Sequence, residues 1–174
     1  MFDYTICITG HTGYIGSHFV EYLTSLGHMP FLVGRKGSKT EPVKGCINSQ
    51  MWRDARELSI QLKDIEKPVF VNLAGLFVSN HKTSNFGELV KSNFAYPLLI
   101  FEAISELEAP KIINVGTSWE FSDRGVKRPF NLYAQLKGSN SDVCDWYTRE
   151  FKFRTINLKL NDTFGGKDPR KKLM

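Results

Sequence analysis

The stretch Thr5-Ile6-Cys7-Ile8-Thr9-Gly10-His11-Thr12-Gly13-Tyr14-Ile15-Gly16 decides the fold that the sequence predicts. It opens with a short apolar and β-branched run, which is typical of a buried strand. Apolar residues at helical spacing then mark one face of a helix that begins inside the glycine turn: Ile15, Phe19, Leu23 and Leu26. A strand, a glycine turn and a helix in this order form the first unit of a parallel α/β sheet.

The same pattern recurs along the chain, because further apolar runs are each followed by turn residues and a segment with helical spacing. The predicted strands lie at residues 5–9, 30–33, 69–73, 112–115 and 155–160, with a weakly marked strand around 45–47. The predicted helices include residues 58–65, a long segment at 86–104 that Pro97 should kink or break, and residues 133–150. We therefore expect an α/β protein with a Rossmann-type, doubly wound parallel sheet in three α/β/α layers.

Composition and charge narrow the class of protein. With 174 residues, of which 41% are hydrophobic and 24% charged, the chain can bury one core, so residues 1–174 are expected to form a single domain. The net charge is +5, but charges of both signs are spread along the chain and no helix carries a basic stripe, which argues against a nucleic-acid partner.

The cysteines and the N-terminus give expectations about compartment and metal. The three cysteines, Cys7, Cys46 and Cys144, lie far apart and form no CxxC pattern, so we expect reduced thiols and no metal site. The N-terminus has no basic n-region, and no apolar stretch approaches the roughly 20 residues of a membrane span. A cytoplasmic protein with no membrane partner is the resulting expectation.

The glycine turn is suited to binding phosphate. Glycine is needed where the backbone takes angles closed to other residues, where it must approach a pyrophosphate, and where helix and strand pack closely. The amides and the positive dipole end of the following helix would hold the phosphates. The strand before and the helix after favour a dinucleotide site over a purely structural turn. Its residues would be Gly10, Thr12, Gly13, Tyr14, Ile15 and Gly16.

The end of the second predicted strand bears on the choice of dinucleotide. An acidic residue at this point would bind the ribose hydroxyls of NAD, whereas a cation would accept the 2′-phosphate of NADP. The sequence there is Gly34-Arg35-Lys36, with no Asp or Glu. Arg35 and Lys36 therefore favour NADP over NAD. The alternative is that both are solvated loop cations.

Two further positions suggest proton transfer. Tyr133 and Lys137 are four residues apart and so share one face of the predicted helix. A cation beside a phenol lowers the tyrosine pKa from about 10 towards the range of a general acid or base. Such spacing also arises by chance, so its context matters. Thr117 and Ser118 follow a strand end, where a hydroxyl could hold a substrate oxygen or could serve only as a helix cap.

These motifs together resemble the extended short-chain dehydrogenase/reductase superfamily, in particular its NAD-dependent epimerase/dehydratase family. Gly10-x-x-Gly13-x-x-Gly16 corresponds to the family's cofactor turn, Asn72-Leu73-Ala74-Gly75 to its fourth-strand motif, and Tyr133-x-x-x-Lys137 to its active-site pair. The resemblance implies that Leu73, Ala74, Gly75, Tyr133 and Lys137 contact the cofactor. It also implies that Thr117 is the catalytic Ser/Thr and that Asn93 supports the active site.

The closing stretch resembles the family's last strand and the loop that follows it. It departs from the family in Phe164 and Gly166, and in Asp162 where the family usually has Asn. In the family, the region after this point adds another strand and a small helical domain that grips the nucleotide sugar. The resemblance therefore predicts a domain that is incomplete at its C-terminus, with the substrate domain largely absent.

The resemblance implies an NADP-dependent reductase, epimerase or dehydratase, with hydride transfer at a sugar carbon and Tyr133 as proton donor or acceptor. Within the family the chain is most similar to NADPH-dependent reductases of CDP-sugars that build dideoxy sugars for O-antigen. The expected partner is a nucleotide-diphosphate sugar, and a homodimer through the two long helices is a family expectation. A second hypothesis is a truncated, catalytically inactive NAD(P)-binding module.

Overall fold

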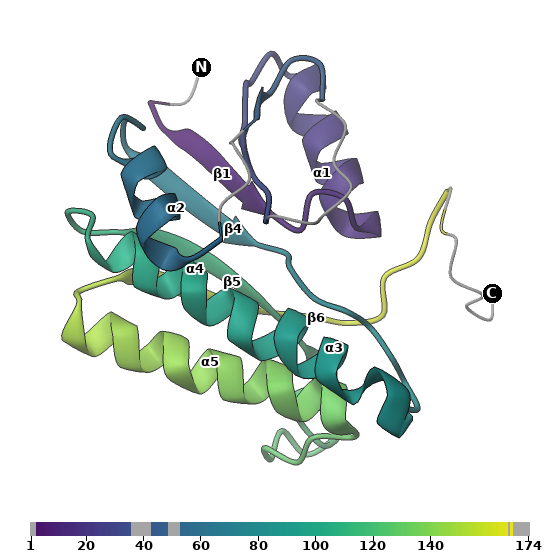
Figure 1. Ribbon diagram of the computed structural model, residues 1–174. Helices are drawn as coiled ribbons and strands as arrows, with labels where there is room; N and C mark the ends of the chain where they lie inside the picture. Colours follow the sequence, from purple (N-terminus) through teal and green to yellow (C-terminus); the bar gives the residue numbers. More distant parts are fainter. Residues whose placement is uncertain (1–2, 36–42, 49–52, 167, 169–174) are drawn as a thin grey trace.

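A six-stranded parallel sheet forms the centre of the protein (Figure 1). The computed structural model describes residues 3–35, 43–48, 53–166 and 168. The strands are β1 (Thr5–Thr9), β2 (Phe31–Val33), β3 (Ile47–Asn48), β4 (Pro68–Asn72), β5 (Lys111–Thr117) and β6 (Arg154–Leu160). Their order, β3-β2-β1-β4-β5-β6, is that of the doubly wound dinucleotide-binding folds, so the predicted fold class is confirmed.

Helices cover both faces of the sheet (Figure 1). They are α1 (Tyr14–Ser25), α2 (Ala55–Leu62), α3 (Phe86–Val90), α4 (Tyr96–Ser105) and α5 (Leu132–Glu150). Helix α1 packs on one face, whereas α2, α4 and α5 pack on the other. None of the helices in the described part of the chain is both long and apolar enough to cross a membrane.

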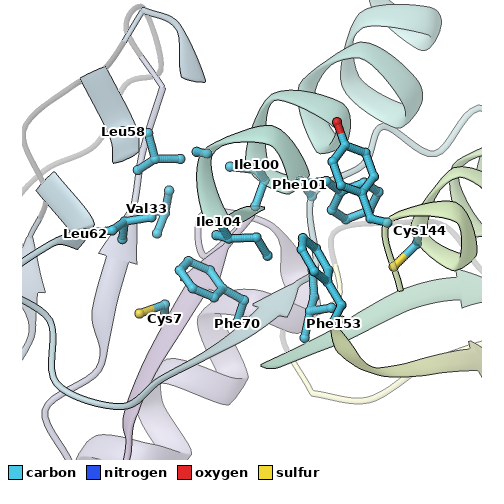
Figure 2. Close-up of a cluster of buried hydrophobic side chains, with 14 of the residues drawn as sticks. Cys7, Val33, Leu58, Leu62, Phe70, Ile100, Phe101, Ile104, Cys144 and Phe153 are labelled. Atoms are coloured by element: carbon cyan, nitrogen blue, oxygen red, sulfur yellow. The ribbon is translucent and has the colours of Figure 1, made fainter. Parts of the chain in front are cut away.

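The central strands are apolar throughout because both of their faces are buried. Successive side chains of a strand point to opposite faces of the sheet. Cys7 of β1 therefore joins the larger core cluster beneath α2, α4 and α5, together with Phe70 and Phe101 (Figure 2). Its neighbour Ile8 joins the smaller cluster beneath α1, together with Leu23. This alternation assigns each strand residue to one of the two layers.

Pro97 does not break the long helical segment at residues 86–105. Helix α3 passes into a π-helical turn, Lys91–Ala95, in which the Tyr96 N–H donates to the Lys91 carbonyl, and the chain then continues as α4. Pro97 lies in the first turn of α4, where its missing N–H costs least. The break in regular α-helical hydrogen bonding that Pro97 predicts is therefore accommodated by the π turn.

One residue of the predicted apolar face of α1 lies elsewhere. Leu26 is 54% exposed, because the helix ends at Ser25 and Leu26 is its C-terminal cap. Val20 takes the buried place beside Leu23. The 3.6-residue period identified the helix correctly but extended it by one position too far.

A ladder of polar side chains crosses four strands of the sheet, in which Thr9, Asn72 and Asn114 are buried and Asn157 is half-buried. The Thr9 hydroxyl donates to Asn72 Oδ1 at 2.8 Å, and Asn72 Nδ2 donates to Asn114 Oδ1 at 2.9 Å. Asn114 Nδ2 donates to Asn157 Oδ1 at 3.0 Å, and Asn157 Nδ2 donates to Asp145 of α5 at 2.6 Å. Each ladder residue is paired in register with the next. Because an unpaired buried amide is costly, the ladder penalises any slip in register.

We expect Asn114→Leu to lower the free energy of unfolding by roughly 2–4 kcal/mol, since it leaves amide groups of Asn72 and Asn157 without their partner. Urea denaturation followed by circular dichroism measures the effect. The matched control, Asn80→Leu, makes the same change at an exposed loop position and should alter the free energy by less than about 0.5 kcal/mol. Equal effects of the two variants would contradict a structural role for the ladder.

The glycine turn between β1 and α1 depends on close backbone contacts. Gly10 has a φ of +73°, and a Cβ placed there would lie 2.6 Å from the Ala74 nitrogen after β4. A Cβ at Gly16 would lie 2.7 Å from the His11 Cα and closer still to the Gly10 carbonyl oxygen. The Gly13 N–H donates to the Gly10 carbonyl at 3.0 Å. Side chains at Gly10 and Gly16 would therefore force the helix away from the sheet.

Gly16→Ala should destabilise the protein by roughly 1–3 kcal/mol, because the added methyl meets backbone that cannot move aside. Gly87→Ala is the matched control, since a Cβ at Gly87 meets nothing within 4 Å. In helix α3 it should be neutral or stabilising by up to about 1 kcal/mol. Thermal unfolding of the two variants beside the wild type compares them directly. A tolerated alanine at Gly16 would refute the close contact.

Candidate active site and cofactor pocket

Two adjoining pockets lie at the carboxyl ends of the strands. Residues common to both linings are Gly10, Gly13, Leu73 and Gly75, so the pockets meet along the glycine turn. The first pocket extends from this turn to the end of β5 and the start of α5. The second extends from it to the end of β2. Together they form a continuous depression across the point where the strand order reverses, which is where open α/β sheets bind ligands.

Lys137 is a nearly buried residue that lines the first pocket. Its Nζ donates to the Ala74 carbonyl at 2.9 Å and to the Val115 carbonyl at 3.0 Å, and the residue is 5% exposed. Burial lowers the pKa of Lys137 to about 8, against the upward effect of the Glu120 carboxylate and together with the downward effect of Lys159. The lysine therefore joins the loop after β4 to strand β5, and its proton is easier to lose than that of an exposed lysine.

Gly75 and Asn93 shape the loop that follows β4. Asn93 is fully buried in the π turn, where its Nδ2 donates to the carbonyls of Leu76 at 2.9 Å and Leu89 at 3.0 Å. Its Oδ1 accepts the Leu76 N–H at 3.1 Å. A Cβ at Gly75 would lie 2.9 Å from this Oδ1 and 3.1 Å from Lys137 Nζ, so glycine is needed there. Asn93 is thus placed to hold the loop and lies outside both pocket linings.

Tyr133 stands in the first turn of α5, one turn from Lys137 and on the same pocket wall. Asn131 caps this helix by accepting the Ala134 N–H at 2.9 Å. The rings of Tyr133 and Phe77 are nearly perpendicular, with 5.3 Å between their centroids. The structure therefore brings the phenol and the ammonium of the predicted pair to one side of the same pocket.

Thr117 ends β5 and lines the same pocket. Its hydroxyl oxygen accepts the Trp119 N–H at 3.3 Å and caps the short 3₁₀ helix Ser118–Glu120, so the capping role anticipated for it is present. In the capping box this oxygen also accepts the Glu120 N–H. A hydroxyl has one donor and two acceptor positions, and the cap uses acceptor positions only. The hydroxyl hydrogen of Thr117 can still donate to a ligand atom.

Arg35 lies at the far end of the second pocket. Its guanidinium carbon stands 5.3 Å from the centre of the Tyr96 ring, and both residues line the pocket. The Tyr96 hydroxyl donates to the Val33 carbonyl at 3.5 Å. Burial raises the pKa of Tyr96, while the charge of Arg35 lowers it. Arg35 is therefore packed against the pocket wall rather than extended into solvent. Lys36, its predicted companion, lies outside the described residues.

The other predicted residues divide between the two pockets: Tyr14, Ile15 and Gly16 line the first, and Thr12 and Ala74 the second. Several lining residues were not anticipated from the sequence, namely Phe77, Trp119, Asn161, Asp162 and Thr163 in the first pocket and His11, Ser92 and Tyr96 in the second. The stretch 161–163 follows β6, so it could have been predicted from the rule that ligands bind beyond the carboxyl ends of parallel strands. Phe77 and Trp119 come from loops that no periodic pattern marks.

The pockets fit a dinucleotide on structural grounds. Gly13 caps α1 without any side-chain hydrogen bond, so the first amides of this helix face the turn without a side-chain partner from the cap. Glycines leave this surface open to a pyrophosphate, and a pocket continues on either side of it. No cluster of three His, Cys, Asp or Glu side chains within the described ranges could hold a metal ion.

Solved structures share this architecture. The UDP-N-acetylglucosamine 4-epimerase of Bacillus cereus superposes with a TM-score of 0.77 at 21% identity, over 95% of this chain and 58% of that one. The UDP-glucuronic acid 4-epimerase of the same organism, solved in complex with NAD, superposes with a TM-score of 0.72 at 21% identity, over 90% of this chain and 56% of that one. At such identities the likeness is one of fold.

Sequence relatives agree with the fold. A CDP-abequose synthase of Yersinia pseudotuberculosis is 27% identical over 171 residues, which cover 97% of this chain and 59% of that protein. The chain thus spans little more than half the length of the relatives that it matches. The sequence model described as "NAD dependent epimerase/dehydratase family" matches residues 6–174, nearly the whole chain. With the glycine turn, the parallel sheet and the pocket in place, the chain belongs to the NAD dependent epimerase/dehydratase family.

Proposed function

We propose that the protein binds NADP and modifies a nucleotide-diphosphate sugar by hydride transfer at a sugar carbon. The observation that carries this proposal is the convergence of Thr117, Tyr133 and Lys137 on one pocket that continues along the glycine turn. A general acid or base, a cation beside it and a hydroxyl donor are the groups needed to move a proton to or from a carbonyl or alcohol oxygen.

Each of the three residues has a separate task. Tyr133 exchanges a proton with the sugar oxygen through its phenol, while Lys137 favours the phenolate by its charge and would bind the cofactor ribose. Thr117 donates its hydroxyl hydrogen to the same sugar oxygen and orients it. The bound cofactor would supply or accept the hydride. Asn93 and Gly75 act indirectly by keeping the loop after β4 in place beneath Lys137.

The substrate class follows from what the relatives have in common. One sequence relative is a CDP-abequose synthase, and solved neighbours include epimerases of UDP-sugars, so a sugar joined to a nucleoside diphosphate is the shared ligand. Reduction, epimerisation and dehydration of such sugars all use hydride transfer at a sugar carbon together with a proton carrier. Within this class, reduction of a CDP-linked keto sugar is the reaction we favour, on the likeness to CDP-sugar reductases.

The NADP preference is supported by Arg35, which takes the position where NAD-binding chains carry an acidic residue. Arg35→Ala should weaken NADPH binding roughly 10-fold to 100-fold, the equivalent of one lost charge-assisted contact with a phosphate, and leave NADH binding nearly unchanged. Calorimetric titration with each nucleotide measures both affinities. Arg53→Ala, at an exposed arginine, is the control and should change neither affinity. Tighter binding of NADH than NADPH by the wild type would favour NAD as the cofactor.

Tyr133→Phe should reduce turnover roughly 10²-fold to 10⁴-fold, because it removes the proton carrier but keeps the ring. Its affinity for NADPH should stay close to that of the wild type. The assay follows oxidation of NADPH in the presence of a CDP-linked 4-keto sugar. Tyr22→Phe, at an exposed position on α1, is the control and should retain full turnover. A wild-type chain that binds NADPH but shows no turnover would favour the hypothesis of a binding module.

A further inference from the structure

A group of charged side chains packs against the backbone of Thr117, in which Glu120 is buried and Lys159 is partly exposed. Glu120 is 1% exposed, and its Oε1 accepts the Thr117 backbone N–H at 2.9 Å. Its Oε2 accepts from Lys159 Nζ at 2.5 Å. The same Nζ donates to the Ser141 hydroxyl at 2.6 Å. The group therefore ties the end of β5 to the edge strand β6 and to α5.

Only the backbone of Gly116 separates this group from the first pocket. Gly116 lines that pocket, and a Cβ placed on it would lie 2.8 Å from Lys159 Nζ and closer still to Glu120 Oε1. Any larger residue at this position would push the carboxylate and the ammonium out of place. The close packing puts two opposite charges immediately behind the residue that precedes Thr117.

Fold stability alone does not account for the buried carboxylate of Glu120, whose partner Lys159 keeps 23% of its side chain exposed. The cost of removing two charges from water often exceeds their attraction, and apolar replacements of a buried ion pair are frequently as stable. The short 3₁₀ helix Ser118–Glu120 has a capping box that needs a hydrogen-bond acceptor from Glu120 but not its negative charge. A role connected with the neighbouring pocket explains why a full charge is kept there.

The electrostatic neighbours of Lys137 support that role. The carboxylate of Glu120 raises the pKa of Lys137, and the ammonium of Lys159 lowers it. Lys127, whose Cε would lie 3.6 Å from a Cβ on Gly138 of α5, is paired with Asp142 on the surface. Glu120 is the carboxylate paired with Lys159, while Asp162 after β6 is a further acidic residue in the pocket lining.

We infer that Glu120 is a positioning residue for the proposed active site, fixing the backbone of Thr117 with one oxygen and holding Lys159 with the other. The inference rests on the proposed function. The carboxylate sets the direction from which the Thr117 hydroxyl enters the pocket. It also offsets the charge of Lys159, which favours the protonated form of Lys137.

Two substitutions separate these two effects. Glu120→Gln keeps an oxygen that can accept the Thr117 N–H but removes the charge, whereas Glu120→Leu removes both. Asp142→Asn is the matched control, because it removes one charge from the surface ion pair between Asp142 of α5 and Lys127 of the preceding loop. Glu120→Gln preserves the size of the side chain, so the test does not depend on whether Glu120→Leu folds.

The first readout needs no turnover. The pKa of Lys137, about 8 in the wild type, is measured by NMR titration of the protein carrying isotope-labelled lysine. It should fall by roughly one unit in Glu120→Gln, since an anion that favours the charged form is lost. Lys159→Met removes the opposing cation and should raise it. Asp142→Asn should leave it unchanged.

The second readout is the pH dependence of turnover with NADPH and a CDP-linked 4-keto sugar. Glu120→Gln should keep most of the wild-type kcat below neutral pH. As the pH is raised, its kcat should begin to fall at a lower pH than that of the wild type. Glu120→Leu should lose at least about 10-fold in kcat at every pH, with the KM for NADPH unchanged, because Thr117 is displaced.

The outcomes are distinct. The inference is supported if the Lys137 pKa is lower in Glu120→Gln and the fall in activity at high pH also moves to a lower pH. An unchanged Lys137 pKa in Glu120→Gln overturns it, as does an unaltered kcat in a folded Glu120→Leu. A wild-type protein without turnover would contradict the proposed function, and the Lys137 titration would then decide alone whether Glu120 sets the charge at this site.

Discussion

The alignment of four strand ends is the constraint on which the candidate site depends. The hydrogen-bonded ladder from Thr9 through Asn72 and Asn114 to Asn157 holds β1, β4, β5 and β6 in one register. Because the strands are parallel, the loops that follow all four of them begin at the same edge of the sheet. The glycine turn, the loop after β4, Thr117 and the stretch after β6 become neighbours in this way, although Gly16 and Asn161 are 145 positions apart in the chain.

Close contacts between backbone and side chains then determine the shape of the pocket. Gly10 and Gly16 let α1 approach the sheet, and Gly75 lets Asn93 and Lys137 reach the loop after β4. Gly116 does the same for Glu120 and Lys159. Glycine thus recurs where a polar or charged group must pass within van der Waals distance of the chain. This explains how a lysine that bridges two buried carbonyls can also line a pocket that is open to ligand.

Much of the fold was predictable because local sequence and tertiary structure agree. The strand at residues 5–9 was predicted with its observed bounds, and the other strands to within one or two residues, since buried parallel strands are continuous apolar runs. The turn with Gly10 and the helix with Tyr133 and Lys137 were found because glycine and the 3.6-residue period leave local signals. The π turn before Pro97 was not found, because the sequence only shows that regular hydrogen bonding must fail near the proline.

By itself, the sequence determined the order of strands and helices, the glycine turn and the spacing of Tyr133 and Lys137, because each depends on residues close together in the chain. Only the tertiary structure decided that Arg35 packs on Tyr96, that Phe77 and Trp119 wall the pocket, and that Glu120 joins Lys159 beneath Thr117. These contacts join residues up to 61 positions apart on different elements. Their formation depends on strand register and loop path, which no local pattern of residues encodes.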